Sequence, residues 1–198
     1  MKNKNNKMIW IGGLLLVLLL VGAYVLYSKL SGGMGGNLAP TEDQGSNASS
    51  TSVQEPPAAP DFLIEDWDGN EFTLADFAGK PIVLNFWATW CGFCKQEMPD
   101  FNELYKEMGE DVHFIMLNAT DGVRETKEIA KDFIEKKGYE FPVYFDNGLE
   151  ASMDYGASGL PMTVFLDSQG RAIAIGRGAL DRESILRGID MAQEVSNG

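Results

Sequence analysis

The two cysteines of this chain are the residues whose types and spacing most clearly indicate chemistry. Cys91 and Cys94 are the only cysteines among 198 residues, and two residues separate them. The apolar run 81–87 before them predicts a buried strand. The apolar residues after them recur at helical spacing, at positions 98, 101, 104, 105 and 108. Cys91 therefore lies at a predicted strand-to-helix junction, where the unpaired N–H groups and the positive helix end favour a thiolate.

This position predicts different roles for the two cysteines, one as nucleophile and one as resolving cysteine. Cysteines at helix N-termini in Cys-X-X-Cys motifs have pKa values lowered from about 8.5 into a range of about 3.5–7.5. We expect Cys91 to be the exposed nucleophile. Cys94, one turn into the helix, is then placed to attack the mixed disulfide that Cys91 forms and to release the product.

Three other interpretations of the cysteine pair are weaker. A structural zinc site needs four ligands, and His113 is the only histidine. A structural disulfide across so short a loop would constrain little of the unfolded chain. A pair of buried apolar thiols is the third alternative. His113 itself lies in the apolar run 112–117, which predicts a strand, and we expect it to pack rather than to react.

The stretch 85–99, Asn-Phe-Trp-Ala-Thr-Trp-Cys-Gly-Phe-Cys-Lys-Gln-Glu-Met-Pro, resembles the active-site block of the thioredoxin superfamily. Its ending, Glu97-Met98-Pro99, resembles the membrane-anchored TlpA/ResA branch of extracytoplasmic thiol-disulfide oxidoreductases. The likeness runs from about Ala59 to the C-terminus. It implies a thioredoxin-like three-layer α/β/α fold with a central mixed sheet, an N-terminal hairpin near 62–74 and a helical insertion, predicted here at 123–137. The alternation of strands and helices also favours a sheet covered on both faces.

The resemblance also implies further site residues. The proline matching Pro161 is cis in the superfamily and lies beside the cysteine pair, so that Leu160 can offer its backbone to an extended client. A proline that merely begins a strand is the alternative. Trp90, Gly92 and Phe93, next to the nucleophile, complete the predicted client-binding set.

Two departures from the thioredoxin pattern concern protons and redox potential. Asn85 stands where cytosolic thioredoxins carry a buried Asp that accepts the proton of the resolving cysteine, and an amide cannot do this. Glu97 matches the acidic residue of the TlpA/ResA branch. A partly buried carboxylate there would have a raised pKa and could shuttle the Cys94 proton; a solvated helix Glu is the alternative. Phe93 replaces the proline of Cys-Gly-Pro-Cys, and the residues between the cysteines tune the potential.

The N-terminal third predicts an anchor and a linker. Residues 8–27 carry no charge, and twenty residues at about 1.5 Å each span a hydrocarbon core of about 30 Å. Three lysines precede this run and only Lys29 follows closely, which predicts a cytoplasmic N-terminus. A signal peptide cleaved near Val21-Gly22-Ala23 is the alternative. The Gly, Ser and Pro content of 31–60 predicts a flexible linker. Residues 1–30 would then form a cytoplasmic tip and a transmembrane anchor, and residues 61–198 would form the thioredoxin-like domain.

The charge of the chain restricts its partners. The net charge is −13, and because residues 1–30 carry four lysines and no acid, the remainder carries −17. Such an acidic body argues against nucleic acid as a partner. No cysteine follows the apolar segment before Cys91, which excludes a lipid-modified lipoprotein.

The predicted function is that of an extracytoplasmic oxidoreductase that reduces client protein disulfides, without a cofactor. The resemblance implies recharging by a membrane electron carrier of the CcdA/DsbD kind and apocytochrome c as client, in cytochrome c maturation. An electron donor to an extracytoplasmic methionine sulfoxide reductase or peroxidase is the alternative within the same chemistry. A thioredoxin-fold metal-delivery module is the alternative from another class; it would need a histidine after His113, and there is none.

Overall fold

A computed structural model of the chain describes Val21, the backbone of residues 37–40, and residues 56–196. Residues 35–198 form one compact unit, to which everything below refers. Its elements, in chain order, are β1 (Asn37–Pro40), β2 (Ile64–Glu65), β3 (Glu71–Phe72), η1 (Leu74–Phe77), β4 (Ile82–Trp87), α2 (Gly92–Met108), β5 (His113–Asn118), α3 (Lys127–Lys137), β6 (Val143–Phe145), α4 (Glu150–Asp154), β7 (Met162–Leu166), β8 (Ala172–Arg177) and α5 (Arg182–Ser196).

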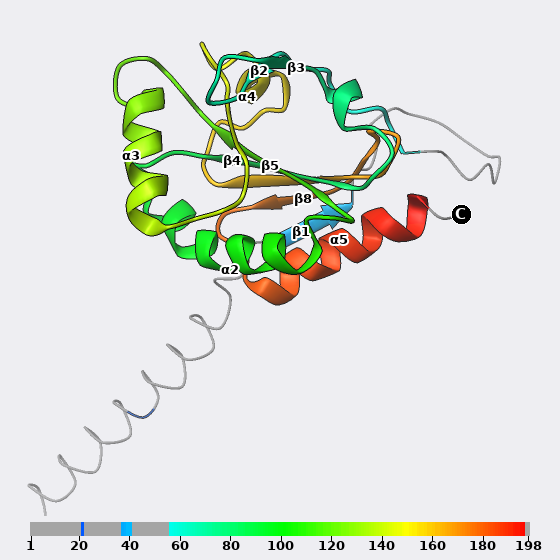
Figure 1. Cartoon of the computed structure of the whole chain (residues 1–198). Coiled ribbons are helices and arrows are strands. Elements are labelled where there is room, and N and C mark those ends of the chain that lie inside the picture. The colour runs from blue at the N-terminus through cyan, green and yellow to red at the C-terminus, as the bar shows by residue number, and fades with distance from the viewer. Residues whose placement is uncertain (1–20, 22–36, 41–55, 197–198) are drawn as a thin grey trace, which may run out of the picture. The chain divides into compact units, whose positions relative to one another are not determined.

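The strands form one mixed sheet in the order β1-β8-β7-β4-β5-β6-β2-β3. β4 lies inside the sheet, parallel to β5 and antiparallel to β7, and Figure 1 shows it beside β5 in the middle of the domain. Every residue of β4 is buried, as expected of a strand whose two faces are both covered. The apolar run that predicts this strand is therefore continuous because neither face meets water.

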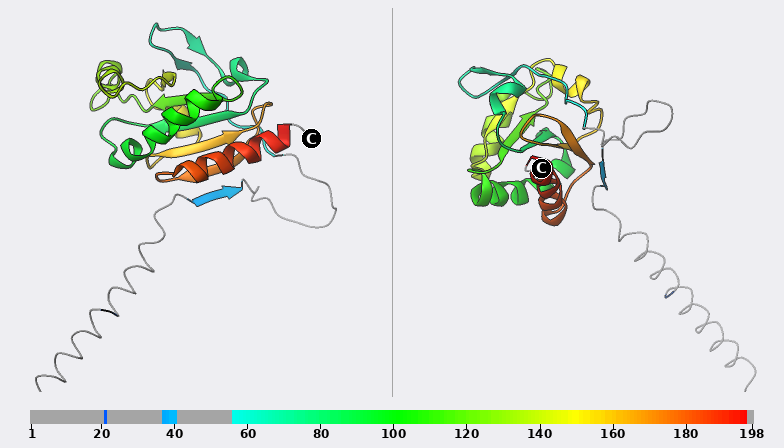
Figure 2. Two further views of the ribbon diagram at one scale, coloured as in Figure 1. Left: turned by 60° about the horizontal axis from the view of Figure 1, so that its bottom comes forward. Right: turned by 90° about the vertical axis from the view of Figure 1, so that its right-hand side faces the viewer.

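Helices cover both faces of the sheet, which confirms the predicted α/β architecture with a central mixed sheet. On one face, Val83 and Trp87 of β4 pack into a core with α2, α3 and α5. On the other face, Leu84 and Phe86 pack with η1, α4 and the hairpin. Figure 2 shows α2 and α5 side by side along the sheet. The period-two alternation of β4 thus divides its side chains between the two cores.

The hairpin and the insertion are both present, but the insertion begins later than predicted. β2 and β3 pair around the Asp68-Gly69 turn, as the sequence indicates. α3 begins at Lys127 with Thr126 as its N-cap, so the predicted start at Val123 is wrong. The carboxylate of Asp121 accepts the N–H groups of residues 123, 124 and 125, which holds them in a turn. Val123 is accordingly 89% exposed and not part of an apolar helix face.

Parts of the range predicted as linker pair with the sheet. β1 pairs antiparallel with β8, and Ala58 forms a bridge with Arg171. The linker prediction rests on the scarcity of apolar side chains, whereas an edge strand needs only backbone N–H and C=O groups to extend a sheet. No helix in the described part of the chain is both long and apolar enough to cross a membrane. The predicted anchor 8–27 lies outside the described residues, apart from Val21.

Candidate active site

The two cysteines form a disulfide at the N-terminus of α2. β4 ends at Trp87, and the chain turns through a hydrogen bond from the Cys91 N–H to the carbonyl of Ala88 (3.1 Å). Cys91 is the N-cap of the helix, and its sulfur accepts the N–H of Cys94 at 3.0 Å. This is the helix-tip position predicted from the sequence. Here the Cys94 N–H, which has no acceptor within the helix, and the helix dipole both act on Sγ of Cys91.

The surroundings of the disulfide leave one sulfur closer to solvent than the other. Cys91 is 5% exposed and Cys94 is fully buried. Trp90 and Phe93, two of the predicted client-binding residues, are 43% and 55% exposed on either side of Cys91. Gly92 between them is exposed as well. Both side chains are therefore accessible to a client.

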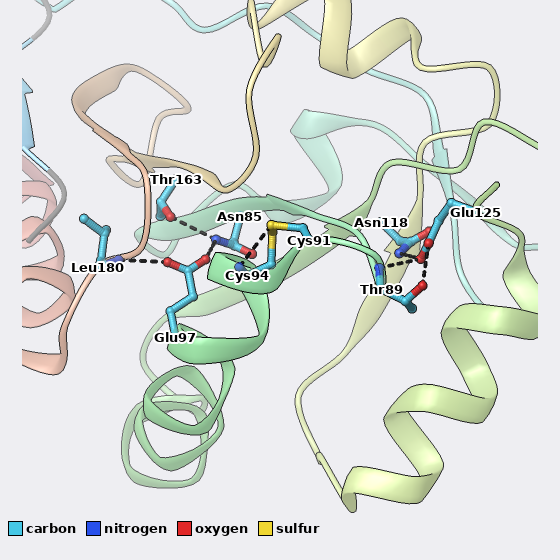
Figure 3. The surroundings of a disulfide bond; sticks show 9 residues. All are labelled: Asn85, Thr89, Cys91, Cys94, Glu97, Asn118, Glu125, Thr163 and Leu180. Carbon is cyan, nitrogen blue, oxygen red and sulfur yellow. Dashed lines mark hydrogen bonds between the residues drawn. A yellow bond between two sulfur atoms is a disulfide. The ribbon is translucent and has the colours of Figure 1, made fainter. Parts of the chain in front are cut away.

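Glu97 lies one turn after Cys94 on the same helix and is 1% exposed. Its Oε1 accepts the Asn85 amide at 2.8 Å, and its Oε2 accepts the Leu180 N–H at 2.9 Å. Figure 3 shows this carboxylate between β4 and the loop before α5, below the disulfide. The solvated-Glu alternative is therefore wrong, because the carboxyl group is enclosed by protein.

Burial dominates the titration of Glu97. The pKa of the carboxyl is raised from 4.5 to about 8, because the charged form has lost its water, and nearby Asp100 adds a smaller rise. The two hydrogen bonds from Leu180 and Asn85 favour the carboxylate and oppose the rise. Helix spacing places Cys94 and Glu97 on one face of α2. The geometry thus provides a group that can hold or release a proton near neutral pH, beside the buried sulfur.

Asn85 connects Glu97 to β7. Its amide N–H group also donates to the Thr163 hydroxyl at 3.0 Å, across the β4–β7 register. Asn85 Oδ1 is buried and has no hydrogen-bond partner in the described structure. Asn85 is thus a neighbour of the titrating carboxyl group, a role that the sequence alone does not indicate because its partners lie 12 and 78 residues away.

Pro161 follows a cis peptide bond from Leu160, as the resemblance implies. Pro161 immediately precedes β7, and the register Phe86↔Met162 puts it beside the end of β4 that leads to the cysteines. His113, in contrast, pairs with Ile82 at the opposite end of β4. Among the described residues, no group of three or more His, Cys, Asp or Glu side chains could hold a metal ion.

A cleft of about 470 Å³ has Trp90, the residue directly before Cys91, in its wall. Its lining comprises Trp90, Ala119, Asp121, Arg124, Leu149, Ser152, Met153, Gly156, Ala157, Ser158 and Leu160. Two predicted client-binding residues, Trp90 and Leu160, belong to this lining, whereas Gly92 and Phe93 do not. The lining is mainly apolar, as in most ligand sites. The guanidinium of Arg124 lies 3.6 Å from the centroid of the Trp90 ring and adds one positive charge.

A second buried carboxylate, Glu125, lies on the other side of the disulfide loop (Figure 3) and is fully buried. It accepts hydrogen bonds from Thr89 and Asn118. The sequence analysis does not identify Glu125 or Arg124, because both fall in a stretch predicted as an amphipathic helix with a solvated charged face. The position of Glu125 in the sequence could indicate its role, because it lies seven residues after Asn118, the last residue of β5. Polar residues that follow the carboxyl ends of parallel strands meet at one edge of the sheet.

The chain is similar to a known protein family and to named thiol-disulfide oxidoreductases. The model of the AhpC/TSA family matches residues 57–174. The thiol-disulfide oxidoreductase ResA of Bacillus thuringiensis subsp. konkukian (strain 97-27) is 38% identical over 128 residues, which cover 64% of this chain and 72% of that protein. ResA of Geobacillus kaustophilus (strain HTA426) is 33% identical over 190 residues, covering 94% of this chain and 97% of that protein.

A solved structure is similar to the chain as well. The crystal structure of a thiol:disulfide interchange protein, DsbE from Chlorobium tepidum, has a TM-score of 0.62 at 27% identity and covers 71% of this chain and 99% of its own. The shared fold, the Cys-X-X-Cys disulfide at a helix tip and the extent of the alignments lead to one assignment. The chain belongs to the AhpC/TSA family of thioredoxin-like proteins, within which it is a thiol-disulfide oxidoreductase of the ResA type.

Proposed function

We propose that this oxidoreductase works outside the cell membrane as a reductant of client protein disulfides. The observation that carries the proposal is the placement of the disulfide: Cys91 caps α2 and keeps 5% of its surface exposed, next to exposed Trp90 and Gly92, while Cys94 is fully buried one turn in. An attacking sulfur must be reachable by a large client, whereas a resolving sulfur needs only to reach its neighbour.

The reaction begins from the dithiol form. The Cys91 thiolate attacks one sulfur of the client disulfide; a Cys91–client bond forms, the client S–S bond breaks, and the client's other sulfur leaves as a thiolate. The Cys94 thiolate then attacks Sγ of Cys91 and expels the second client sulfur. Two electrons pass to the client, and the enzyme ends in the Cys91–Cys94 disulfide form that the structure describes.

Glu97 manages the proton of the second step. Cys94 is buried, so its proton cannot pass directly to bulk water. Glu97 lies one helical turn away, and burial raises its pKa to about 8. A carboxylate of that basicity accepts the Cys94 proton as the thiolate forms and holds it in the disulfide state at neutral pH.

The cleft beside Cys91 receives the client segment next to its reactive cysteine. Trp90 and Leu160 form two of its walls, and Met153, 68% exposed, lies at its edge. Leu160, which belongs to this lining, directly precedes Pro161. Mainly apolar walls, with Asp121 and Arg124 as the two charged residues of the lining, favour a client segment that carries a large apolar side chain.

The location and the partners extend this proposal to the membrane. Residues 8–27 would anchor the chain with its N-terminus in the cytoplasm, and a carrier of the CcdA/DsbD kind would return the dithiol form. Apocytochrome c is the proposed client class, in cytochrome c maturation. Support comes from the charge-free N-terminal run and from the alignment with ResA, which extends over 94% of this chain.

Trapping in membranes tests the proposal. Full-length Cys94→Ala, expressed in bacterial membranes, should accumulate mixed disulfides with clients through Cys91, because the resolving sulfur is missing. Cys91→Ala is the matched control and should trap none. Identification of the trapped proteins names the client class. Equal trapping by both variants, or none by Cys94→Ala, would refute the assignment of the two sulfurs.

A further inference from the structure

The carboxylate of Glu125 makes three hydrogen bonds in a fully buried site. Its Oε1 accepts the Thr89 N–H at 2.9 Å and the Asn118 amide at 2.8 Å, and its Oε2 accepts the Thr89 hydroxyl at 2.6 Å. The Thr120 hydroxyl donates to Asn118 Oδ1 at 2.9 Å and so sets the direction of the Asn118 amide. Two of the three partners, the Thr89 N–H and the Asn118 amide N–H, can only donate, and such hydrogen bonds favour the charged form of a carboxyl group.

This carboxylate joins two loops that both border the disulfide. Thr89 lies two residues before Cys91, in the turn that leads from β4 into α2. Glu125 belongs to the loop before α3, where Asp121 Oδ1 accepts the Glu125 N–H at 2.9 Å. The contact spans 36 residues of sequence. Two hydrogen bonds to one carboxylate hold both the backbone and the side chain of Thr89, which restrains the turn that presents Cys91.

The ionised form of this group places a negative charge close to the nucleophile. Two residues of chain cover at most roughly 7 Å, so the carboxylate lies on the order of 10 Å from Cys91. Other titratable groups on these elements include Lys95 and Glu97 on α2, and Asp121 and Arg124 in the loop before α3. Arg124 lies over the Trp90 ring rather than on the buried carboxylate. The charge of Glu125 therefore acts on the thiolate through the protein interior, where screening is weak.

We propose that Glu125 is a positioning residue for the thiol–disulfide reaction. It fixes Thr89, and with it the turn that presents Cys91. Its negative charge also disfavours the Cys91 thiolate and so makes the dithiol a stronger reductant. A less stable thiolate means a less stable reduced form, which passes its electrons on more readily. This inference rests on the proposed role of Cys91 as the nucleophile.

The substitution Glu125→Gln removes the charge of the side chain while keeping its hydrogen bonds. The amide oxygen can accept the Thr89 N–H and the Asn118 amide, and the amide N–H can donate to the Thr89 hydroxyl, so the three contacts persist without the charge. A unit charge roughly 10 Å away changes a pKa by about one unit at an effective dielectric constant of about 20. At a pH below its pKa, the thiolate fraction of Cys91 then rises about tenfold. Because thiolate nucleophilicity falls with pKa, we expect iodoacetamide to alkylate Cys91 of the reduced variant about threefold faster.

The redox equilibrium gives the second readout. Above the Cys91 pKa, the equilibrium of full-length Glu125→Gln with a dithiothreitol buffer should shift about tenfold toward the dithiol, equivalent to about 30 mV for two electrons. Glu128→Gln, an exposed acid three residues on, is the matched control and should match the wild type. A folded Glu125→Gln with an unchanged alkylation profile and an unchanged equilibrium would overturn the role of the charge and leave Glu125 a structural residue.

Thr89→Val tests the positioning role and does not depend on the folding of the Glu125 variant. It removes the hydroxyl but keeps the N–H contact, and we expect insulin-disulfide reduction to slow about fivefold, with Thr89→Ser restoring the rate. Wild-type turnover in Thr89→Val would overturn the positioning role. Mapping the alkylated cysteine by mass spectrometry distinguishes a failure of the proposed function from a failure of the inference about Glu125. Label on Cys94 in the wild type refutes the proposed function, whereas label on Cys91 with an unmoved profile refutes only the inference about Glu125.

Discussion

Replacing the buried carboxyl group by Glu97→Gln should remove a large pH dependence of stability from the disulfide form. The amide cannot ionise, and it fits the site: its oxygen can accept the Leu180 N–H, and its N–H can donate to Asn85 Oδ1, which is buried without a partner in the described structure, once the Asn85 amide turns. Turning the Asn85 amide moves its N–H group away from the Thr163 hydroxyl, so the substitution has a hydrogen-bond cost, but that cost is the same at every pH and does not affect the pH dependence.

The size of the effect follows from the pKa of Glu97. In the unfolded chain the group titrates at 4.5, and in the folded protein burial raises its pKa to about 8. Between these values the folded state binds more protons than the unfolded state, so the free energy of unfolding falls as pH rises through this window. Each pKa unit corresponds to 1.36 kcal/mol, which gives a loss of about 5 kcal/mol in the wild type across the whole window.

Urea unfolding of the oxidised protein, followed by tryptophan fluorescence from pH 4 to 9, measures this loss. The stability of the wild type relative to Glu97→Gln should decline steadily between pH 4.5 and 8 and then level off. Glu103→Gln, an exposed acid on the same helix, should follow the wild type at every pH. A constant difference between wild type and Glu97→Gln across this range would contradict the argument from burial.

Three further predictions concern packing and the cleft. Gly188→Ala should lower the free energy of unfolding in urea by about 1–3 kcal/mol, since the added Cβ would lie 2.5 Å from the Phe165 ring. Ser152→Ala should leave that free energy unchanged or raise it by up to about 1 kcal/mol, because it removes a buried hydroxyl that has no partner in the described structure. Met153→Ser, at the edge of the cleft, should raise KM for a client-derived peptide disulfide about fivefold at unchanged kcat, as about 1 kcal/mol of contact is lost.

The strand-to-helix junction could be predicted from the sequence because its determinants are local. The unbroken apolar run of β4 reflects a strand with two covered faces, and the apolar spacing after Cys94 reflects one buried stripe of α2. The placement of Cys91 at the helix tip follows from these two segments alone. The mixed sheet follows in turn from the alternation of such segments.

The polar contacts of the site could not be predicted in this way. The partner of Glu97 at Leu180 lies 83 residues away, and that of Glu125 at Thr89 lies 36 residues away. A buried acid and a solvated acid look alike in sequence until the fold brings their donors together. The predicted start of α3 is wrong for a related reason. The Asp121 carboxylate accepts the N–H groups of residues 123–125 and holds them in a turn, and the spacing of apolar residues carries no information about such hydrogen bonds.

The central claim is that Cys91, at the positive end of α2, is the reactive sulfur of the pair. Limited alkylation of the reduced full-length chain at pH 7, with the modified residue mapped by mass spectrometry, measures this directly. The structure predicts that label accumulates on Cys91 alone, and faster than on cysteine in an unfolded peptide, because the helix tip stabilises its thiolate and burial protects Cys94. Label divided equally between the two sulfurs, or a rate no higher than that of the peptide, would contradict the account.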